Sequence, residues 1–396
     1  MPRVASGGER CGPPPETDQE RGQPSPTLRE GNSVTITRSH AVIALAMTGA
    51  LALGACGTDA NKTSTGGSGA ASTDCPTGTL KAEGSSAQKA AIEAAIKSFQ
   101  TTCTGATVNY AATGSGAGIK QFIAAQVDFG GTDSALKDDE AASAATTCAA
   151  PAWHLPMVTG PVGVAYNLPS LPSLVLNADV TAKIFLGQIT MWNDPALAAI
   201  NPGVTLPDKK ISVFFRSDDS GTTDNFTKYL KAAAGSSWTV ESGKKWNGTV
   251  GEGKPQNAGV ATAAKGVEGS IAYLEWSYIT QNKLGLAKID TGSGPVELTS
   301  ASVGKMIETA KQKGSGNDLS LTLDYATKTP GAYPINLVTY EVVCSTYKDP
   351  AKGKLVKAFL THFSSVETQK SLESLGYAPL PASIEAKVQT AIAAIG

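Results

Sequence analysis

From Gly78 onward, short apolar runs alternate with helical repeats. Residues 78–86 (GTLKAEGSS) predict a strand that runs into a small polar turn, and residues 87–100 (AQKAAIEAAIKSFQ) predict a helix with one apolar face. Strand, turn and helix follow in the same order at 106–126, and VDFGGTDSAL at 127–136 predicts a third strand and turn. Three such units in series favour an α/β sheet covered by helices.

The second half of the chain continues this pattern. Residues 209–234 predict a strand, a turn and a helix, and residues 259–281 predict a helix, a turn and a strand. Residues 332–381 predict a strand, a long helix and a loop. Sheets of this class bind ligands at the carboxyl ends of their strands, where helices begin. The turns are therefore the first place to look for a site.

The composition is typical of a globular protein and argues against a nucleic-acid partner. A length of 396 residues allows two domains with separate cores, and 41% hydrophobic and 17% charged residues are ordinary for a globular protein. A formal net charge of −1 gives no basic field of the kind that nucleic-acid-binding proteins carry. We therefore expect no nucleic-acid partner, and any attraction for an anion must be local.

The N-terminal part of the chain is typical of a targeting region. Residues 1–33 are rich in Pro, Gly and charge without an apolar period, and we interpret them as a disordered or non-native extension ahead of a start near Val34. Arg38 and His40 then precede an apolar run that is too short to span a bilayer. The run suits the core of a signal peptide over residues 34–55.

A lipid anchor is expected directly after this signal peptide. Residues 53–56, LGAC, match a bacterial lipobox, in which Cys56 becomes the lipidated first residue of the mature protein. A plain secretory signal cut near Ala55 is the alternative. Residues 56–74 are rich in Gly, Ser and Thr and would form a flexible tether, so we expect a globular body beside a membrane, outside the cytoplasm.

The remaining cysteines fit an oxidising compartment. Apart from Cys56 and a cysteine in the extension, the chain has four, an even number. Of the three pairings that four cysteines allow, we favour Cys75–Cys103 with Cys148–Cys344. Free buried thiols are an alternative, whereas a zinc site would need a CxxC pair or clustered histidines that the sequence lacks.

Four short segments carry small residues and hydroxyl groups. They are Gly84-Ser85-Ser86-Ala87, Gly114-Ser115-Gly116-Ala117-Gly118, Thr132-Asp133-Ser134, and Arg216 with Ser220-Gly221-Thr222. Three of them place a hydroxyl at the predicted start of a helix, where backbone N–H groups lack partners. Arg216 adds a planar fork of charged donors. Together they predict a site for a compact oxyanion that needs neither a metal nor a cofactor.

Other interpretations of these residues exist. Any one of the serines alone is more typical of a helix N-cap, and Arg216 alone of an ion pair. The glycines at 114–118 lack the GxGxxG spacing of a dinucleotide loop. A phosphatase or esterase would use Ser86, Ser115 or Ser220 as nucleophile, but no histidine lies near them in sequence and no G-x-S-x-G elbow is present. We therefore do not expect an enzyme.

The order and spacing of eight segments resemble the phosphate-binding lipoproteins and periplasmic proteins that serve bacterial phosphate ABC importers. The segments are GSSAQ, GSGAGIKQF, VDFGGTDSAL, KIFLGQITMWNDPAL, NPGVTLP, RSDDSGTTDNFTKYL, GSIAYLEWSY and LGYAPLP, and the resemblance extends from about Leu80 to Pro381. It implies an α/β, two-lobed periplasmic-binding-protein fold of type II with the ligand cleft between the lobes.

The resemblance also implies how the chain divides into lobes. Lobe I would comprise residues 75–158 and 334–396, and lobe II residues 159–333. The chain would cross between the lobes near 156–158 and near 333–335, and these two crossings would act as a hinge that closes on the ligand.

The same resemblance implies a set of phosphate ligands. They are Ser86, Ala87, Ser115, Asp133, Arg216, Ser220, Gly221 and Thr222. Family members often have Thr-Phe where this chain has Ser86-Ala87, a departure that bears on affinity.

Two aspartates have implied roles beside the donors. Asp133 would accept a hydrogen bond from protonated phosphate and repel sulfate, which has no proton to donate. Its alternative role is the N-cap of a helix that begins near Ser134. Asp218 would orient Arg216, and its alternative is a solvated acid in a turn.

The implied function is high-affinity extracytoplasmic binding of inorganic phosphate and its delivery to the permease subunits of a phosphate ABC transporter. The protein would be a monomer, anchored to the cell membrane by a lipid on Cys56. A sensing or adhesion lipoprotein of the same fold, or a binding protein for another oxyanion such as sulfate or molybdate, are the alternatives.

Overall fold

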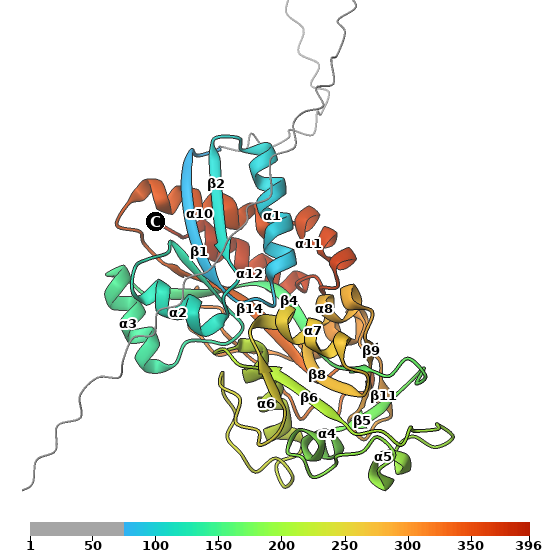
Figure 1. Cartoon of the computed structure of the whole chain (residues 1–396). Coiled ribbons are helices and arrows are strands. Elements are labelled where there is room, and N and C mark those ends of the chain that lie inside the picture. Colours follow the sequence, from blue (N-terminus) through green and yellow to red (C-terminus); the bar gives the residue numbers. More distant parts are fainter. Residues whose placement is uncertain (1–74) are drawn as a thin grey trace, which may run out of the picture. The chain divides into compact units, whose positions relative to one another are not determined.

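The computed structural model describes residues 75–396. The expected extension, signal peptide, lipidated Cys56 and tether all lie outside the described residues. The described part is a mixed α/β structure around a nine-stranded sheet in the order β2-β1-β3-β14-β4-β8-β6-β7, with β9 paired to β4 (Figure 1).

The expected lobe I contains the β2-β1-β3-β14 half of the sheet. Its strands are β1 (Gly78–Gly84), β2 (Ala106–Ala111), β3 (Phe129–Thr132) and β14 (Asn336–Cys344). Its helices are α1 (Lys89–Thr102), α2 (Ser115–Ile123), α3 (Asp138–Cys148), α10 (Pro350–Phe363), α11 (Val366–Ser371), a 3₁₀ helix (Leu372–Leu375) and α12 (Ala382–Ala393). A core that includes Phe99, Phe129 and Phe359 holds α1 and α10 against the sheet.

The expected lobe II contains the β8-β6-β7 half. Its other strands are short: β7 (Glu252–Lys254), β5 (Val175–Asn177), β9 (Gly285–Leu286), β10 (Lys288–Asp290), β11 (Pro295–Val296), β12 (Lys311–Gln312) and β13 (Leu321–Thr322), beside β6 (Ser212–Arg216) and β8 (Ser270–Glu275). Its helices are α4 (Ala178–Phe185), α5 (Pro195–Ala199), α6 (Gly221–Ala233), α7 (Gln256–Gly266), α8 (Trp276–Asn282) and α9 (Ser300–Ile307). Stacked aromatic rings of Phe226, Tyr273 and Trp246 mark its core.

Strand β4 (Ala152–Asn167) belongs to both lobes. It pairs antiparallel with β14 up to Pro161 and with β8 from Val162 onward. At that point the N–H of Val162 donates to Ile335 O (2.9 Å), just ahead of β14. The two strands that join the lobes therefore change partners side by side. The crossing expected at 156–158 lies within the part of β4 that pairs with β14.

The predicted strand, turn and helix units are present, with three local differences. The strand expected to run up to residue 281 ends at Glu275, and helix α8 begins at Trp276. Helix α2 begins at Ser115, inside the small-residue segment 114–118 that was expected to be a turn. Gly114 can precede the helix directly because glycine readily adopts its positive φ of 115°. The long helix expected near the C-terminus is broken in two. Ser365 Oγ accepts the N–H of Thr368 and so starts α11 as a separate helix.

Both favoured disulfides are formed, Cys75–Cys103 and Cys148–Cys344. The first links the start of β1 to the end of α1, and the second links α3 to the end of β14. With all four sulfurs paired, the free-thiol and zinc alternatives for these cysteines are wrong. Between residues 75 and 396, the helices are too short or too polar to cross a bilayer.

Candidate functional site

The eight residues expected to bind an anion come together where strands end and helices begin. Ser86 and Ala87 follow β1, Asp133 follows β3, and Arg216 ends β6, while α2 begins with Ser115 and α6 begins with Gly221. The residues named in this group are all buried: Ser86, Ala87, Ser115, Asp133, Arg216, Ser220, Gly221 and Thr222. Four loops that are far apart in sequence thus form one polar cluster inside the protein.

Arg216 is the charged donor of this cluster. Its side chain is 1% exposed, it pairs with Asp218 through Nε (2.8 Å) and Nη2, and its Nη1 lies 3.3 Å from Thr222 Oγ1. Burial raises the pKa of Asp218, but hydrogen bonds and charge from Arg216 outweigh this effect and hold that pKa below its usual value. Asp218 also accepts the N–H of Gln256, so the guanidinium has a fixed orientation.

The first turn of α6 presents hydroxyl and N–H donors beside Arg216. Ser220 is its N-cap, and Ser220 Oγ accepts the N–H of Thr223 (3.2 Å), which leaves the hydroxyl proton free to donate. The N–H groups of Gly221 and Thr222 have no acceptor among residues 75–396. These donors and the positive end of the helix dipole attract an anion.

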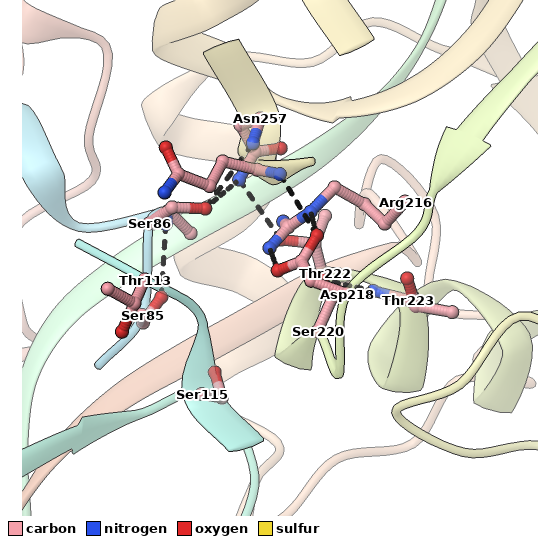
Figure 2. Close-up of polar contacts among 12 residues, drawn as sticks. Ser85, Ser86, Thr113, Ser115, Arg216, Asp218, Ser220, Thr222, Thr223 and Asn257 are labelled. Atoms are coloured by element: carbon pink, nitrogen blue, oxygen red, sulfur yellow. Dashed lines mark hydrogen bonds and ion pairs between the residues drawn. The ribbon is translucent and has the colours of Figure 1, made fainter. Parts of the chain in front are cut away.

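Asn257, which the sequence did not single out, joins the two lobes at this cluster. Its Nδ2 lies 3.2 Å from Ser86 Oγ and 3.3 Å from Thr222 Oγ1, and its own N–H also reaches Ser86 Oγ (Figure 2). Because both hydroxyl oxygens accept from Asn257, both hydroxyl protons are free for another acceptor. No local pattern marks Asn257, since its partners are brought to it only by the folded chain.

Asp133 is the one carboxylate among the eight residues expected to bind an anion. Its Oδ2 accepts from Ser115 Oγ (3.1 Å), its Oδ1 accepts from Thr339 Oγ1 (2.7 Å), and its backbone N–H donates to Ser115 Oγ. Burial raises the pKa of Asp133, against the opposing effect of hydrogen bonds and of the Arg216 charge. Helix α3 begins at Asp138, so the alternative role of Asp133 as the cap of a helix near Ser134 is wrong.

Not every expected donor is free. The N–H of Ala87 donates to Ser85 Oγ (3.0 Å), and the Ser115 hydroxyl is engaged with Asp133. Ser86 and Ala87 are also held through their carbonyl oxygens, which accept from the hydroxyls of Tyr278 and Tyr377. The turn after β1 is therefore fixed by both lobes.

Gly221 allows α6 to approach the Asp133 loop. A Cβ at Gly221 would lie 2.5 Å from Asp133 Oδ2 and 2.6 Å from Ser115 Oγ, well inside normal contact. The side-chain amide of Asn225 continues the contact one turn later by donating to Asp133 O (2.8 Å). Lobe II thus meets lobe I through the backbone of its anion-attracting helix.

Two buried glutamates lie behind the cluster. Burial raises the pKa of Glu341 and of Glu275 to about 8 each, and the negative charge of Asp133 adds to both shifts. Glu341 Oε1 accepts from Gln88 Nε2 (2.7 Å), and Glu275 caps α8 through the N–H of Ser277. Burial therefore favours the protonated form of both carboxyls.

The described histidines do not activate the candidate serines. His154 bonds to Asp318 (2.7 Å) and to the N–H of Leu136, and His362 contacts Ser98. Within the same part of the chain, His, Cys, Asp and Glu side chains form no group suited to hold a metal ion. What the cluster can do is hold an oxyanion through neutral donors and one guanidinium.

Comparison with known proteins gives the family. The model for the PBP superfamily domain matches residues 69–367. Phosphate-binding protein PstS 3 of Mycobacterium tuberculosis (strain ATCC 25618 / H37Rv) is 47% identical over 368 residues, which cover 91% of this chain and 99% of that protein. Phosphate-binding protein PstS of Xylella fastidiosa (strain Temecula1) is 34% identical over 292 residues, 72% of this chain and 77% of that protein.

Solved structures share the fold. A phosphate-binding protein from Stenotrophomonas maltophilia has a TM-score of 0.62 at 18% identity and covers 79% of this chain and 93% of its own. A putative phosphate ABC transporter substrate-binding protein with bound phosphate, from Clostridium perfringens, has a TM-score of 0.56 at 18% identity, with 77% and 100% covered. The chain therefore belongs to the PstS family of phosphate-binding proteins and has the two-lobed fold of periplasmic binding proteins.

Proposed function

We propose that this protein binds inorganic phosphate between its two lobes and delivers it to the permease of an ABC importer. The observation that carries the proposal is the buried cluster in which Arg216, the first turn of α6 and the hydroxyls of Ser86 and Thr222 surround the Asp133 loop. The names of its PstS relatives, and their identity over nearly the whole chain, support the same ligand.

Three kinds of donor would bind the anion: a guanidinium, backbone N–H groups and hydroxyl groups. Arg216 supplies the full positive charge, and the N–H groups of Gly221 and Thr222 supply the helix end. The hydroxyls of Ser86, Ser220 and Thr222 donate because their oxygens already accept elsewhere. A small tetrahedral anion suits donors that converge in this way.

Three residues have conditional roles in the proposal. Asp133 accepts a hydrogen bond from a phosphate that still carries a proton, which selects against sulfate. Ser115 keeps Asp133 in place, and it binds phosphate when its hydroxyl turns from Asp133 to the ligand. Ala87 contributes its N–H after exchanging Ser85 Oγ for a phosphate oxygen.

Capture and release follow from motion of the lobes. We place the hinge at the residues where β4 leaves β14 for β8, beside the start of β14. With lobes of residues 75–158 plus 334–396 and 159–333, opening separates Ser86 from Asn257 and exposes the donors. The relatives are named as binding proteins, and the proposed mechanism needs no chemical step.

The setting of this activity is the outer face of the cell membrane. A lipid on Cys56 would hold the protein, as a monomer, close to the permease. Labelling with a radioactive fatty acid tests the anchor: the wild-type protein should carry label, and Cys56→Ala should carry none. Label retained by Cys56→Ala would contradict the proposal.

Isothermal titration calorimetry tests the ligand. The purified protein should bind inorganic phosphate with one site per chain and give no heat of binding with sulfate or molybdate. A folded protein that binds sulfate or molybdate but not phosphate would establish a different oxyanion as the ligand. A folded protein that binds none of the three would contradict an oxyanion function altogether.

A further inference from the structure

A hollow of about 630 Å³ opens beside the anion-binding cluster. Gly116, Ala135 and Asp219 line it, and each lies one or two residues from Ser115, Asp133 or Ser220. Its other lining residues come from helices α2, α3 and α6, from the loop at 242–247, and from the adjoining loops. The hollow therefore borders three of the four loops that make the proposed phosphate site.

The lining of this hollow is strongly basic. Its positive side chains are Lys120, Lys137, Lys228, Lys244, Lys245 and Lys313. Its carboxylates are Glu140, Asp219 and Asp224. Six lysines against three carboxylates leave an excess of three positive charges, in a chain whose formal net charge is −1.

The ion pairs show which charges make up the excess. Asp219 pairs with Lys120 (3.1 Å), Asp224 with Lys228 (2.6 Å) and Glu140 with Lys244 (3.9 Å), so every carboxylate of the hollow has a lysine partner.

The other three lysines are Lys137, Lys245 and Lys313. All three are exposed, and among the described residues none has a carboxylate within 4 Å of its side-chain ammonium group.

A second, smaller cavity adjoins the hollow. It has a volume of about 210 Å³, shares Ala135, Lys228 and Lys313 with the hollow, and is lined by Asp133 itself. The lysine-lined hollow therefore adjoins a cavity that has Asp133, a residue of the proposed phosphate site, in its lining.

We propose that this lysine-lined hollow is a vestibule that collects phosphate from solution and speeds its entry into the site. The inference rests on the proposed phosphate-binding function and adds a kinetic role for residues that do not hold the bound ligand. Clefts lined by one sign of charge concentrate the opposite ion and raise association rates by about 10-fold to 1,000-fold. The effect acts on the association rate, since the bound phosphate contacts other residues.

The test compares two variants with the same net charge. The vestibule variant carries Lys137→Gln, Lys245→Gln and Lys313→Gln. The control carries Lys265→Gln, Lys354→Gln and Lys370→Gln, three exposed lysines that line neither cavity. Stopped-flow fluorescence measures the association and dissociation rates of inorganic phosphate for each protein at low and at high salt.

At about 0.01 M ionic strength, where the Debye length is ~30 Å, the vestibule variant should bind phosphate roughly threefold to tenfold more slowly than wild type. Its dissociation rate should stay unchanged, and the difference should vanish at about 1 M salt, where the Debye length is ~3 Å. The control should keep at least most of the wild-type association rate.

Equal slowing of both variants would overturn the vestibule, because net charge alone would then account for the rate. An unchanged rate in the vestibule variant would overturn it as well. Absence of phosphate binding by the wild-type protein in calorimetry is a separate result, which would overturn the proposed function and this inference together.

Discussion

The side-chain amide of Asn257 lies 3.2 Å from the hydroxyl oxygen of Ser86, although 171 residues separate them in the chain. The same amide nitrogen lies 3.3 Å from Thr222 Oγ1. The neutral side chain of Asn257 therefore bridges the loop that follows β1 and the first helical turn of α6. By donating to both hydroxyl oxygens, it directs both hydroxyl protons toward an anion.

Substitution of Asn257 should weaken phosphate binding in a graded way. Asn257→Ala removes the bridge and should lower affinity by roughly 5-fold to 10-fold, since a neutral hydrogen bond contributes ~1 kcal/mol. Asn257→Asp should lower it further, because a carboxylate would take the hydroxyl protons and repel the anion. Titration calorimetry measures both affinities, and equal or tighter binding by Asn257→Asp would contradict this role.

Replacement of Arg216 by lysine should separate charge from geometry. Arg216 is the sole arginine of residues 75–396, and Lys keeps the charge without the planar fork that reaches Asp218 and Thr222 together. Arg216→Lys should bind phosphate about 10-fold to 150-fold more weakly, because hydrogen bonds to charged groups contribute ~1.5–3 kcal/mol.

Equilibrium dialysis with radioactive phosphate measures this loss, and thermal unfolding shows whether the variant is folded. Wild-type affinity in a folded Arg216→Lys protein would mean that the guanidinium does not contact the ligand.

A methyl group at Gly221 should block the approach of the two lobes. The added Cβ would lie 2.5 Å from Asp133 Oδ2, and overpacking of this kind costs about 1–3 kcal/mol. Gly221→Ala should therefore lose roughly 5-fold to 150-fold in phosphate affinity with little change in melting temperature, because the lobes can stay apart. The control is Gly304→Ala in α9, where a Cβ meets open space and should leave affinity unchanged.

Wild-type affinity in Gly221→Ala would show that the helix does not need to come this close.

The buried glutamates predict how stability depends on pH. Burial first, and then the charge of Asp133, raises the folded-state pKa of Glu341 from 4.5 to about 8. The stability that Glu341 contributes is fully present below pH 4.5 and is lost as the pH rises through about 8, because the folded state holds the proton more tightly. In that window each such group lowers the unfolding free energy by about 1.4 kcal/mol per pH unit.

Glu341→Gln keeps an oxygen that can accept from Gln88 but cannot ionise. Its unfolding free energy, measured by urea denaturation at several pH values between 5 and 9, should fall less steeply than that of the wild type. Parallel curves for the two proteins would contradict a buried, neutral Glu341.

The sequence predicted those parts of the site that have a local signature. The sequence predicts the strand that ends in Arg216 and the N-cap serine that follows it, because the donor, the cap and the start of the helix lie within seven residues. The roles of Asn257 and Thr339 cannot be predicted in this way. Thr339 reaches Asp133 from 206 residues away in a buried strand, where a threonine looks like any β-forming residue.

The fold also has parts that local sequence predicts and parts that depend on residues far away in the chain. Apolar periods predicted the strand and helix units of both lobes, since each unit buries its own face. They did not predict that β4 runs through both lobes as one strand of sixteen residues. That continuity depends on β14 and β8, which reach β4 from later parts of the chain.

The central claim is that Asp133 makes the cluster a phosphate site rather than a general oxyanion site. The most direct measurement is the ratio of phosphate to sulfate affinity in wild type and in Asp133→Asn, by titration calorimetry at one pH. We predict a wild-type ratio of at least about 10⁴, which falls by at least tenfold in the variant because the amide no longer repels sulfate. An unchanged ratio in a folded Asp133→Asn protein would contradict the account.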